Sequence, residues 1–394
     1  MNAGLGRTVA RRLYRAALEG VDPERRVAEA LRDRKITRAL EQAREVGVFA
    51  VGKAAAGMLR GALGRYRRGL AVLPRGSGRV RAPGVGTVLS SHPQPDGSSV
   101  SAARRALAFF RTFGREDLLL CLVSGGASSL LALPRPGVTL GQKRRAVARL
   151  ARSGASILEI NRLRTSLSSV KGGALGRATR ARLVTLVISD VPGDRPGLVG
   201  SGPTIRGRRG DLVRLVGTNA MGLEAAAREA RRLGFSPRIA LRRLSGEARE
   251  AGARLAQRAR KLSPGEVLLA GGETTVALPS RPGRGGRNLE LALGAARQME
   301  GEKGLLLLAA GSDGRDGSSR ATGAFADGQT IARARRRGLD FEEAFRRHET
   351  EPFFARLSDL LVTGPTGTNV ADWVFAVRLG RRGREPADRE GSPL

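Results

Sequence analysis

Short apolar runs alternate with longer amphipathic stretches along most of this chain. VGVFAV at residues 46–51 is one such run, and its continuity predicts a strand that is buried on both faces. The stretch TVARRLYRAALEG near the start has helical spacing instead, and Asp22-Pro23 predicts the start of a second helix. This alternation is typical of an α/β protein with mainly parallel sheets.

Each apolar run ends in small or polar residues. Further runs with their polar ends are DLLLCLVSGGASS, RLVTLVISDVPGD, GEVLLAGGETT, GLLLLAAGSDGRDG and DLLVTGPTGTN. In open parallel sheets, the loops at the carboxyl ends of the strands line the ligand crevice. Backbone N–H groups in glycine-rich turns and at helix starts can hold anions there. Repeated along one chain, such loops predict a site for a polyanion.

The 394 residues are enough for two or three domains. Residues 234–266 predict a strand and a helix that lead from the first half of the chain to the second. We therefore expect an N-terminal α/β domain at residues 1–240 and a C-terminal α/β domain at residues 241–380. Residues 381–394 are polar and contain proline and glycine, which predicts a loose tail.

The formal net charge is +34, and the basic residues are six lysines and 64 arginines. A basic surface is typical of nucleic-acid binding. The arginines are scattered over the whole chain, however, and aromatic residues make up only 4%, so stacking platforms for single strands are scarce. We expect no specific nucleic-acid partner, and a surface that attracts anionic substrates.

The chain gives no sign of a membrane or secretory segment. No apolar run reaches the roughly 18 residues of a membrane span, and the basic N-terminus lacks the apolar core of a signal peptide. The single cysteine, Cys121, lies within the apolar run LLLCLVS and fits a reducing compartment. We therefore expect a cytoplasmic protein without a membrane partner.

Lys53 ends the string GVFAVGK, which matches the start of the phosphate-binding loop GxxxxGK[ST]. Ala54 follows in place of the hydroxyl residue, and the intervening residues form the expected strand, so the match is accidental. Lys53 still lies at a strand-to-helix junction, where an ammonium can contact a phosphate or carboxylate. A solvated surface lysine is the alternative. SGGASS at residues 124–129 fits phosphate contact or a tight turn equally well, and no GxGxxG is present.

Acidic residues are scarce, and four follow expected strands: Asp190 and Asp194 in ISDVPGD, and Asp313 and Asp316 in GSDGRDG. Such carboxylates can hold Mg²⁺ or orient an attacking hydroxyl, whereas aspartate beside glycine is also common in plain turns. Arg287 lies just before a helix-like stretch, where a guanidinium can bind a carboxylate or phosphate. The loop TGPTGTN could wrap a phosphate or only turn the chain, and the histidine in SHPQPDG fits a turn as well as catalysis.

Taken together, these segments resemble the glycerate 2-kinases of the MOFRL family, also called class II glycerate kinases. The matching strings, in chain order, are VGKAAAGM, SHPQPD, SGGASSLL, INRLR…KGG, ISDVPGD…SGPT, GGETTV, GGRNLELAL, GSDGRDG and TGPTGTNVAD. They cover nearly the whole chain. Each string alone is weak, but their joint order is specific.

The resemblance implies a Rossmann-like N-terminal domain, a MOFRL-type C-terminal domain and an active site in the cleft between them. It also implies ATP, Mg²⁺ and the conversion of D-glycerate to 2-phosphoglycerate, and it leaves a homodimer open. On this interpretation the catalytic residues are Lys53, Arg287 and Asp190, and the metal ligands are Asp194, Asp313 and Asp316. Substrate or nucleotide contacts are assigned to Ser124, Gly125, Gly126, Ser128, Lys171, Glu273, Asn288, Thr366 and Asn369. The alternatives are a hydroxypyruvate reductase-like oxidoreductase and a basic nucleic-acid-binding protein.

The chain departs from the family pattern at four positions. Thr165 and Ser166 stand where the family usually has a lysine and a histidine. Arg195 replaces a commonly acidic residue, and Arg320 replaces a frequent aspartate. These changes affect expected contacts with substrate and metal more than the fold.

Overall fold

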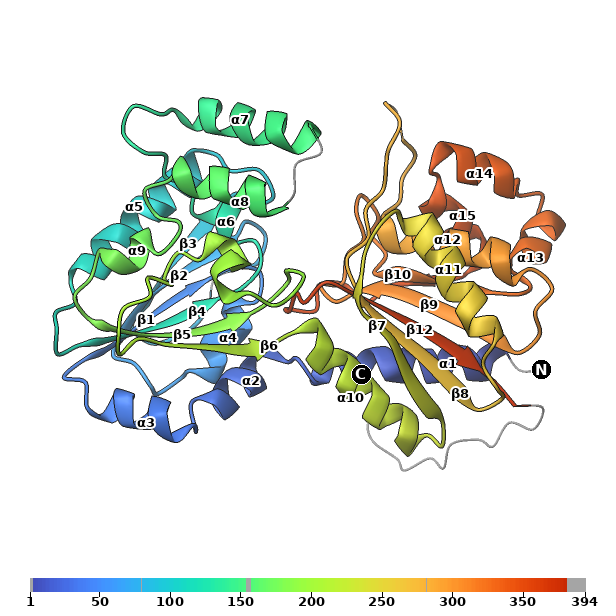
Figure 1. Cartoon of the computed structure of the whole chain (residues 1–394), viewed down its shortest axis with the longest axis horizontal. Helices are drawn as coiled ribbons and strands as arrows, with labels where there is room; N and C mark the ends of the chain where they lie inside the picture. The colour runs from blue at the N-terminus through green and yellow to red at the C-terminus, as the bar shows by residue number, and fades with distance from the viewer. Residues whose placement is uncertain (1–2, 79, 154–156, 281, 381–394) are drawn as a thin grey trace. The chain divides into compact units, whose positions relative to one another are not determined.

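The computed structural model describes residues 3–78, 80–153, 157–280 and 282–380, which form two compact units (Figure 1). The N-terminal unit comprises Val21–Thr218 and Gly367–Val370. The C-terminal unit comprises the described residues up to Gly20, Asn219–Thr366 and those from Ala371 onward. The tail expected at residues 381–394 lies outside the described residues.

The N-terminal unit contains a sheet of six parallel strands in the order β3-β2-β1-β4-β5-β6. The strands are β1 (Val46–Val51), β2 (Arg68–Pro74), β3 (Val85–Ser90), β4 (Leu118–Val123), β5 (Arg182–Ile188) and β6 (Leu212–Gly217). This is the strand order of the Rossmann fold. The expected parallel, Rossmann-like sheet is therefore confirmed, and its order reverses between β1 and β4.

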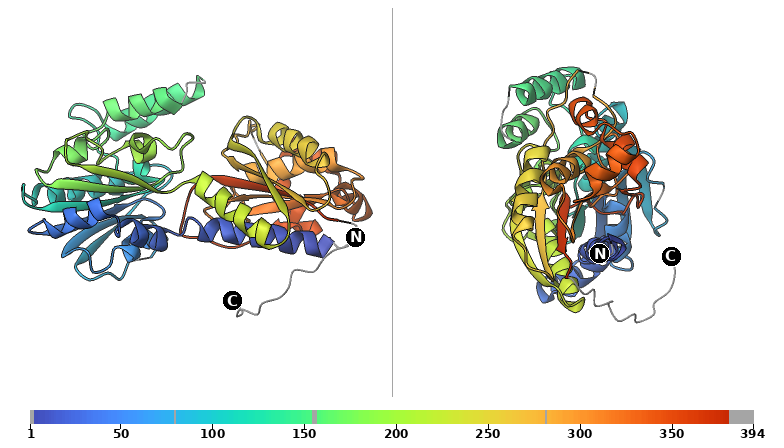
Figure 2. Two further views of the ribbon diagram at one scale, coloured as in Figure 1. Left: turned by 60° about the horizontal axis from the view of Figure 1, so that its bottom comes forward. Right: turned by 90° about the vertical axis from the view of Figure 1, so that its right-hand side faces the viewer.

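Helices cover both faces of this sheet (Figure 2). They are α2 (Pro23–Ala30), α3 (Arg34–Glu41), α4 (Ala55–Gly61), α5 (Gly97–Arg111), α6 (Ala127–Leu130), α7 (Leu140–Arg152), α8 (Ile157–Ser166), α9 (Ala174–Arg177) and the 3₁₀ segment η1 (Pro196–Ser201). Asp22 caps α2 by accepting a hydrogen bond from the Arg25 backbone N–H at 2.8 Å, as the sequence predicts. Cys121 is fully buried in β4, within the core beneath α5.

The C-terminal unit contains a second six-stranded sheet, in the order β11-β10-β9-β12-β8-β7. Its strands are β7 (Ser236–Leu244), β8 (Glu266–Gly272), β9 (Leu305–Gly311), β10 (Gly323–Asp327), β11 (Leu360–Leu361) and β12 (Asp372–Arg378). Only β7 and β8 pair in parallel; the other four pairings are antiparallel. The expectation of a mainly parallel sheet is wrong here, because β12 and β10 each run against both of their neighbours.

Two layers of helices enclose the second sheet. One face carries α11 (Ala248–Arg260), α12 (Arg287–Met299), α13 (Thr330–Arg336), α14 (Phe341–Arg347) and α15 (Thr350–Leu357). The other carries α1 (Ala3–Glu19) and α10 (Asn219–Arg232), which lie side by side (Figures 1 and 2). No helix in the described part of the chain is long and apolar enough to cross a bilayer.

The expected domain boundary near residue 240 differs from the division that the structure shows. The chain passes between units at Thr218 and Asn219, and α10 and β7 pack in the C-terminal unit. The first helix belongs there too, because the Tyr14 hydroxyl donates to the Gly311 carbonyl at 2.8 Å and its ring meets Trp373 edge-on at 6.1 Å. Such long-range contacts leave no mark in local sequence pattern.

Candidate active site

The strand order of the N-terminal unit reverses between β1 and β4; β1 is followed by a turn at Gly52 and Lys53, and β4 by the glycine-rich turn SGGASS. The two turns are joined directly. The Lys53 backbone N–H donates to the Gly125 carbonyl at 2.9 Å, and the Ala54 N–H donates to the Ser124 hydroxyl at 3.0 Å. In a Rossmann-type sheet, ligands bind outside the strand ends at this switch point.

Gly52 permits this close approach of the two turns. Its φ is +121°, and a Cβ atom there would lie 2.2 Å from the Ser124 hydroxyl oxygen. The Ser124 side chain is fully buried and holds the turns together. Ser124, expected to contact a ligand, therefore has a structural role in this geometry.

Asp190 lies against the glycine-rich turn after β4. A Cβ atom at Gly125 would fall 2.0 Å from the Asp190 Oδ2 atom and 2.8 Å from the Asn369 Nδ2 atom. The Asn369 amide donates to Asp190 Oδ2 at 3.1 Å. Asn369 lies in the short segment Gly367–Val370, which returns to this unit far along the chain. Three residues that the sequence singles out separately thus lie in one group.

Gly126 adopts the left-handed region at φ +86°, between two other candidate side chains. A Cβ atom there would lie 3.1 Å from the His92 ring and 3.4 Å from Lys53 Cγ. Lys53 therefore lies beside the turn, and His92, which the sequence left open, joins it. Asp194 lies further along the loop after β5, with its own φ at +50°.

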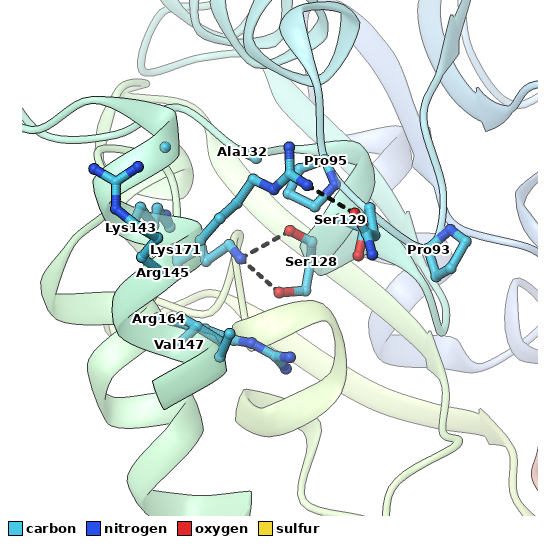
Figure 3. A pocket seen from close by; sticks show the side chains of 14 residues that line it. Pro93, Pro95, Ser128, Ser129, Ala132, Lys143, Arg145, Val147, Arg164 and Lys171 are labelled. Carbon is cyan, nitrogen blue, oxygen red and sulfur yellow. Dashed lines mark hydrogen bonds between the residues drawn. The ribbon is translucent and has the colours of Figure 1, made fainter. Parts of the chain in front are cut away.

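Lys171 and Ser128 are also brought together. The buried Lys171 ammonium donates to the Ser128 carbonyl at 2.8 Å and to its hydroxyl at 2.5 Å. Burial lowers the pKa of Lys171 well below its ordinary value, and the nearby charges of Lys143 and Arg164 lower it further. Both residues line a pocket of about 600 Å³ in the N-terminal unit (Figure 3).

Arg287 begins α12 in the C-terminal unit and is held by two carboxylates. Its Nε and Nη2 atoms donate to Asp372 at 2.5 and 3.1 Å, and Nη1 donates to Glu273 at 2.5 Å. Asp372 starts β12, and because β12 is antiparallel, this end meets the carboxyl ends of β8 and β9. Sequence reasoning missed Asp372, although it lies within the string TGPTGTNVAD.

Asp316, expected as a metal ligand, caps α12. Its Oδ1 accepts from the Asn288 backbone and side chain at 3.1 and 3.2 Å, and its Oδ2 accepts from the Leu289 N–H at 2.9 Å. It is only 1% exposed, and burial raises its pKa to about 7. Its two oxygens are thus committed to the helix, and Asn288, expected to contact a ligand, is buried in the same cap.

Asp313 and Thr366 organise the loops beside β9. Asp313 Oδ1 accepts from the Arg315 N–H at 3.2 Å in a local turn. The Thr366 hydroxyl donates to the Ser312 carbonyl at 2.5 Å. Within the described residues, no three acidic, histidine or cysteine side chains gather closely enough to hold a metal ion. The metal ligands expected from sequence do not form a cluster of that kind.

The N-terminal sheet has the Rossmann strand order, and a lysine, a glycine-rich turn and an aspartate lie at its switch point. This arrangement is typical of α/β enzymes that bind anionic ligands. Residues 9–226 match a domain of unknown function (DUF4147), and residues 266–372 match the MOFRL family. The glycerate 2-kinase of Pyrococcus horikoshii is 34% identical over 96% of this chain and 98% of its own length. The chain therefore belongs to the MOFRL family, which includes such glycerate 2-kinases, and is a kinase.

Two further comparisons bear on this assignment. The crystal structure of a glycerate kinase from Thermotoga maritima aligns with a TM-score of 0.84 at 33% identity, covering 94% of this chain and 99% of that one. A protein of Agrobacterium vitis named as a hydroxypyruvate reductase is 39% identical over 77% of this chain and 89% of its own length.

Proposed function

We propose that this protein transfers the γ-phosphoryl group of ATP to the 2-hydroxyl of D-glycerate, giving 2-phosphoglycerate and ADP. The observation that carries this proposal is the nearly full-length similarity to the glycerate 2-kinase of Pyrococcus horikoshii. The grouping of Lys53, the Gly125–Gly126 turn and Asp190 at the switch point supports it. A cytoplasmic location agrees with a single, buried cysteine.

Phosphoryl transfer needs the reacting groups positioned and the developing charge neutralised, with little covalent chemistry from the protein. Lys53, beside the Gly125–Gly126 turn, would supply a compact positive charge to the transferred group. Asp190, oriented by Asn369, would accept the proton of the attacking hydroxyl or hold the metal. The backbone N–H groups of the turn would hold phosphate oxygens.

Arg287 would bind an anionic substrate group from the C-terminal unit. Three of the five guanidinium N–H groups are engaged by Asp372 and Glu273, which fix the side chain in place. The Arg287 side chain stays 34% exposed, so part of the guanidinium group would remain accessible to a carboxylate or phosphate. Glu273 would then position Arg287 and not contact the nucleotide.

The aspartates of the candidate site could supply some of the ligands of a Mg²⁺ ion, but not all of them. Magnesium bound with a nucleotide usually takes one or two carboxylates, with phosphate oxygens and water supplying the remaining ligands, so a cluster of three acids is not required. Asp190 is the best candidate, with Asp194 and Asp313 as further ones, whereas Asp316 is occupied as a helix cap. The ion would neutralise charge on the phosphates.

An oxidoreductase is the second candidate, favoured by the Rossmann strand order and the relative named as a hydroxypyruvate reductase. A dinucleotide site would need a glycine-rich fingerprint after β1, and GxGxxG is absent from the sequence. The two functions separate in one experiment. ADP release that depends on D-glycerate supports the kinase, and NADH oxidation with hydroxypyruvate in the absence of ATP would contradict it.

A further inference from the structure

The pocket of about 600 Å³ in the N-terminal unit is formed by α7, α8 and the residues around α6 (Figure 3). Among the described residues, five basic side chains line it: Lys143, Arg144, Arg145, Arg164 and Lys171. No aspartate or glutamate is among the lining residues that the structure describes. Cations are thus concentrated here without the carboxylates that pair with arginines elsewhere in the unit.

Lys143 is the most informative of these side chains. It is only 5% exposed, and its ammonium has no hydrogen-bond partner among the described residues. A buried ammonium without a partner is costly, so proteins seldom keep one without a reason. Burial, with a contribution from Arg164, lowers its pKa to about 8.

Lys171 and Arg164 share this environment. Lys171 is 4% exposed, and its partner among the described residues is the neutral Ser128, to whose carbonyl and hydroxyl it donates (Figure 3). Burial lowers the pKa of Arg164 as well. Three basic groups, two buried and one partly buried, therefore lie around one hollow, beside the SGGASS turn that carries Gly125 and Gly126 at the switch point. An anion entering this pocket would receive several charge-assisted hydrogen bonds.

We propose that this pocket binds the polyphosphate chain of the nucleotide, with Lys143, Arg164 and Lys171 as its cationic contacts. This rests on the proposed kinase function and assigns the nucleotide to the N-terminal unit. Three basic groups suit a triphosphate better than a single carboxylate, because a bound polyanion would favour the protonated form of each. The volume is also that of a pocket for a drug-sized ligand, and a three-carbon acid would fill little of it.

Lys143→Met tests the proposal in the full-length protein, by calorimetric titration with tripolyphosphate and by kinetics. Affinity for tripolyphosphate should fall by about tenfold to a hundredfold, as expected for losing a charge-assisted hydrogen bond. KM for ATP should rise similarly, while KM for D-glycerate changes less than about twofold. Without ligand, the melting temperature should stay equal or rise, because the change removes an unpaired buried charge.

Arg149→Gln is the matched control, since Arg149 is an exposed cation on the same helix that does not line this pocket. It removes an equal charge and should change tripolyphosphate affinity by less than about twofold. Unchanged tripolyphosphate affinity in Lys143→Met would overturn the proposal, as would a rise in KM for D-glycerate alone. A clear loss of melting temperature would also count against it, because it would reveal a partner for the ammonium.

The binding experiment does not depend on the acceptor substrate. If the wild-type protein fails to phosphorylate D-glycerate yet loses tripolyphosphate affinity through Lys143→Met, the proposed acceptor is wrong and the polyphosphate pocket stands. If D-glycerate is phosphorylated and neither affinity nor KM for ATP responds to the change, the pocket assignment alone is wrong.

Discussion

Gly125→Ala would disturb the candidate active site with a single methyl group. Gly125 has no left-handed φ, so alanine fits its backbone, and the whole effect comes from the space beside Cα. The new Cβ would lie 2.0 Å from Asp190 Oδ2 and 2.8 Å from Asn369 Nδ2. An ordinary contact begins at 3.4 Å, so the carboxylate must retreat by about 1.4 Å and its bond to Asn369 would be strained.

A catalytic group misplaced by about 1 Å can cost about a hundredfold in rate. We therefore expect kcat with D-glycerate and ATP to fall by about 10²-fold, or about 2.7 kcal/mol in activation free energy. Overpacking should cost about 1–3 kcal/mol in the free energy of unfolding, which leaves the fold intact. The assay is initial-rate kinetics, with circular dichroism and thermal melting to confirm folding.

Gly97→Ala is the matched control, because Gly97 starts α5 and a Cβ atom there meets open space. Its kinetics should match those of the wild type, with stability equal or raised by up to about 1 kcal/mol. Wild-type kcat/KM in a folded Gly125→Ala protein would refute the reasoning. It would mean that neither Asp190 nor the turn takes part in catalysis.

Three further predictions concern single side chains. Lys53→Met should lower kcat by about 10²–10³-fold with the fold intact. Lys53→Arg should restore little of this activity, because a planar guanidinium cannot replace a compact ammonium. Unchanged kinetics in both variants would indicate a solvated lysine. Arg287→Met should lower the free energy of unfolding by about 3 kcal/mol in urea titrations, because it leaves the buried Asp372 carboxylate without its ion-pair partner. The double variant Arg287→Met/Asp372→Asn should recover part of this loss. No recovery would contradict the pairing. The pKa of Asp316 is raised to about 7 in the folded state, so the folded protein binds this proton more tightly and stability should fall as pH rises from about 4 to about 7. Asp316→Asn should flatten this slope in melting experiments, and an identical slope in both proteins would show that Asp316 does not cause it.

The local pattern predicts the N-terminal sheet well, because strands such as β1 and β4 are short, continuous apolar runs followed by turns that begin with small residues. It fails for the C-terminal sheet. The run DWVFAVR at Asp372–Arg378 is apolar too, but nothing in it shows that it inserts between β8 and β9 in the opposite direction. Because that direction was not predicted, Asp372 was not recognised as the partner of Arg287.

The candidate site shows the same division between local and long-range information. The sequence singles out Gly125, Asp190 and Asn369 as separate loop residues, and only folding brings them into contact. The sequence does not predict a binding role for Lys143, because it lies in a basic, amphipathic helix whose charged residues are expected to face solvent. Its burial depends on how α7 packs in the N-terminal unit, which no local pattern records.

The central claim is that the phosphoryl group reaches the 2-hydroxyl of glycerate, and a coupled assay with enolase tests it most directly. Enolase converts 2-phosphoglycerate to phosphoenolpyruvate without a mutase, whereas 3-phosphoglycerate is not its substrate. With D-glycerate, ATP and Mg²⁺, we expect phosphoenolpyruvate to form in step with ADP when no mutase is present. ADP that accumulates without phosphoenolpyruvate would contradict the proposed position of transfer, and no glycerate-dependent ADP would contradict the activity itself.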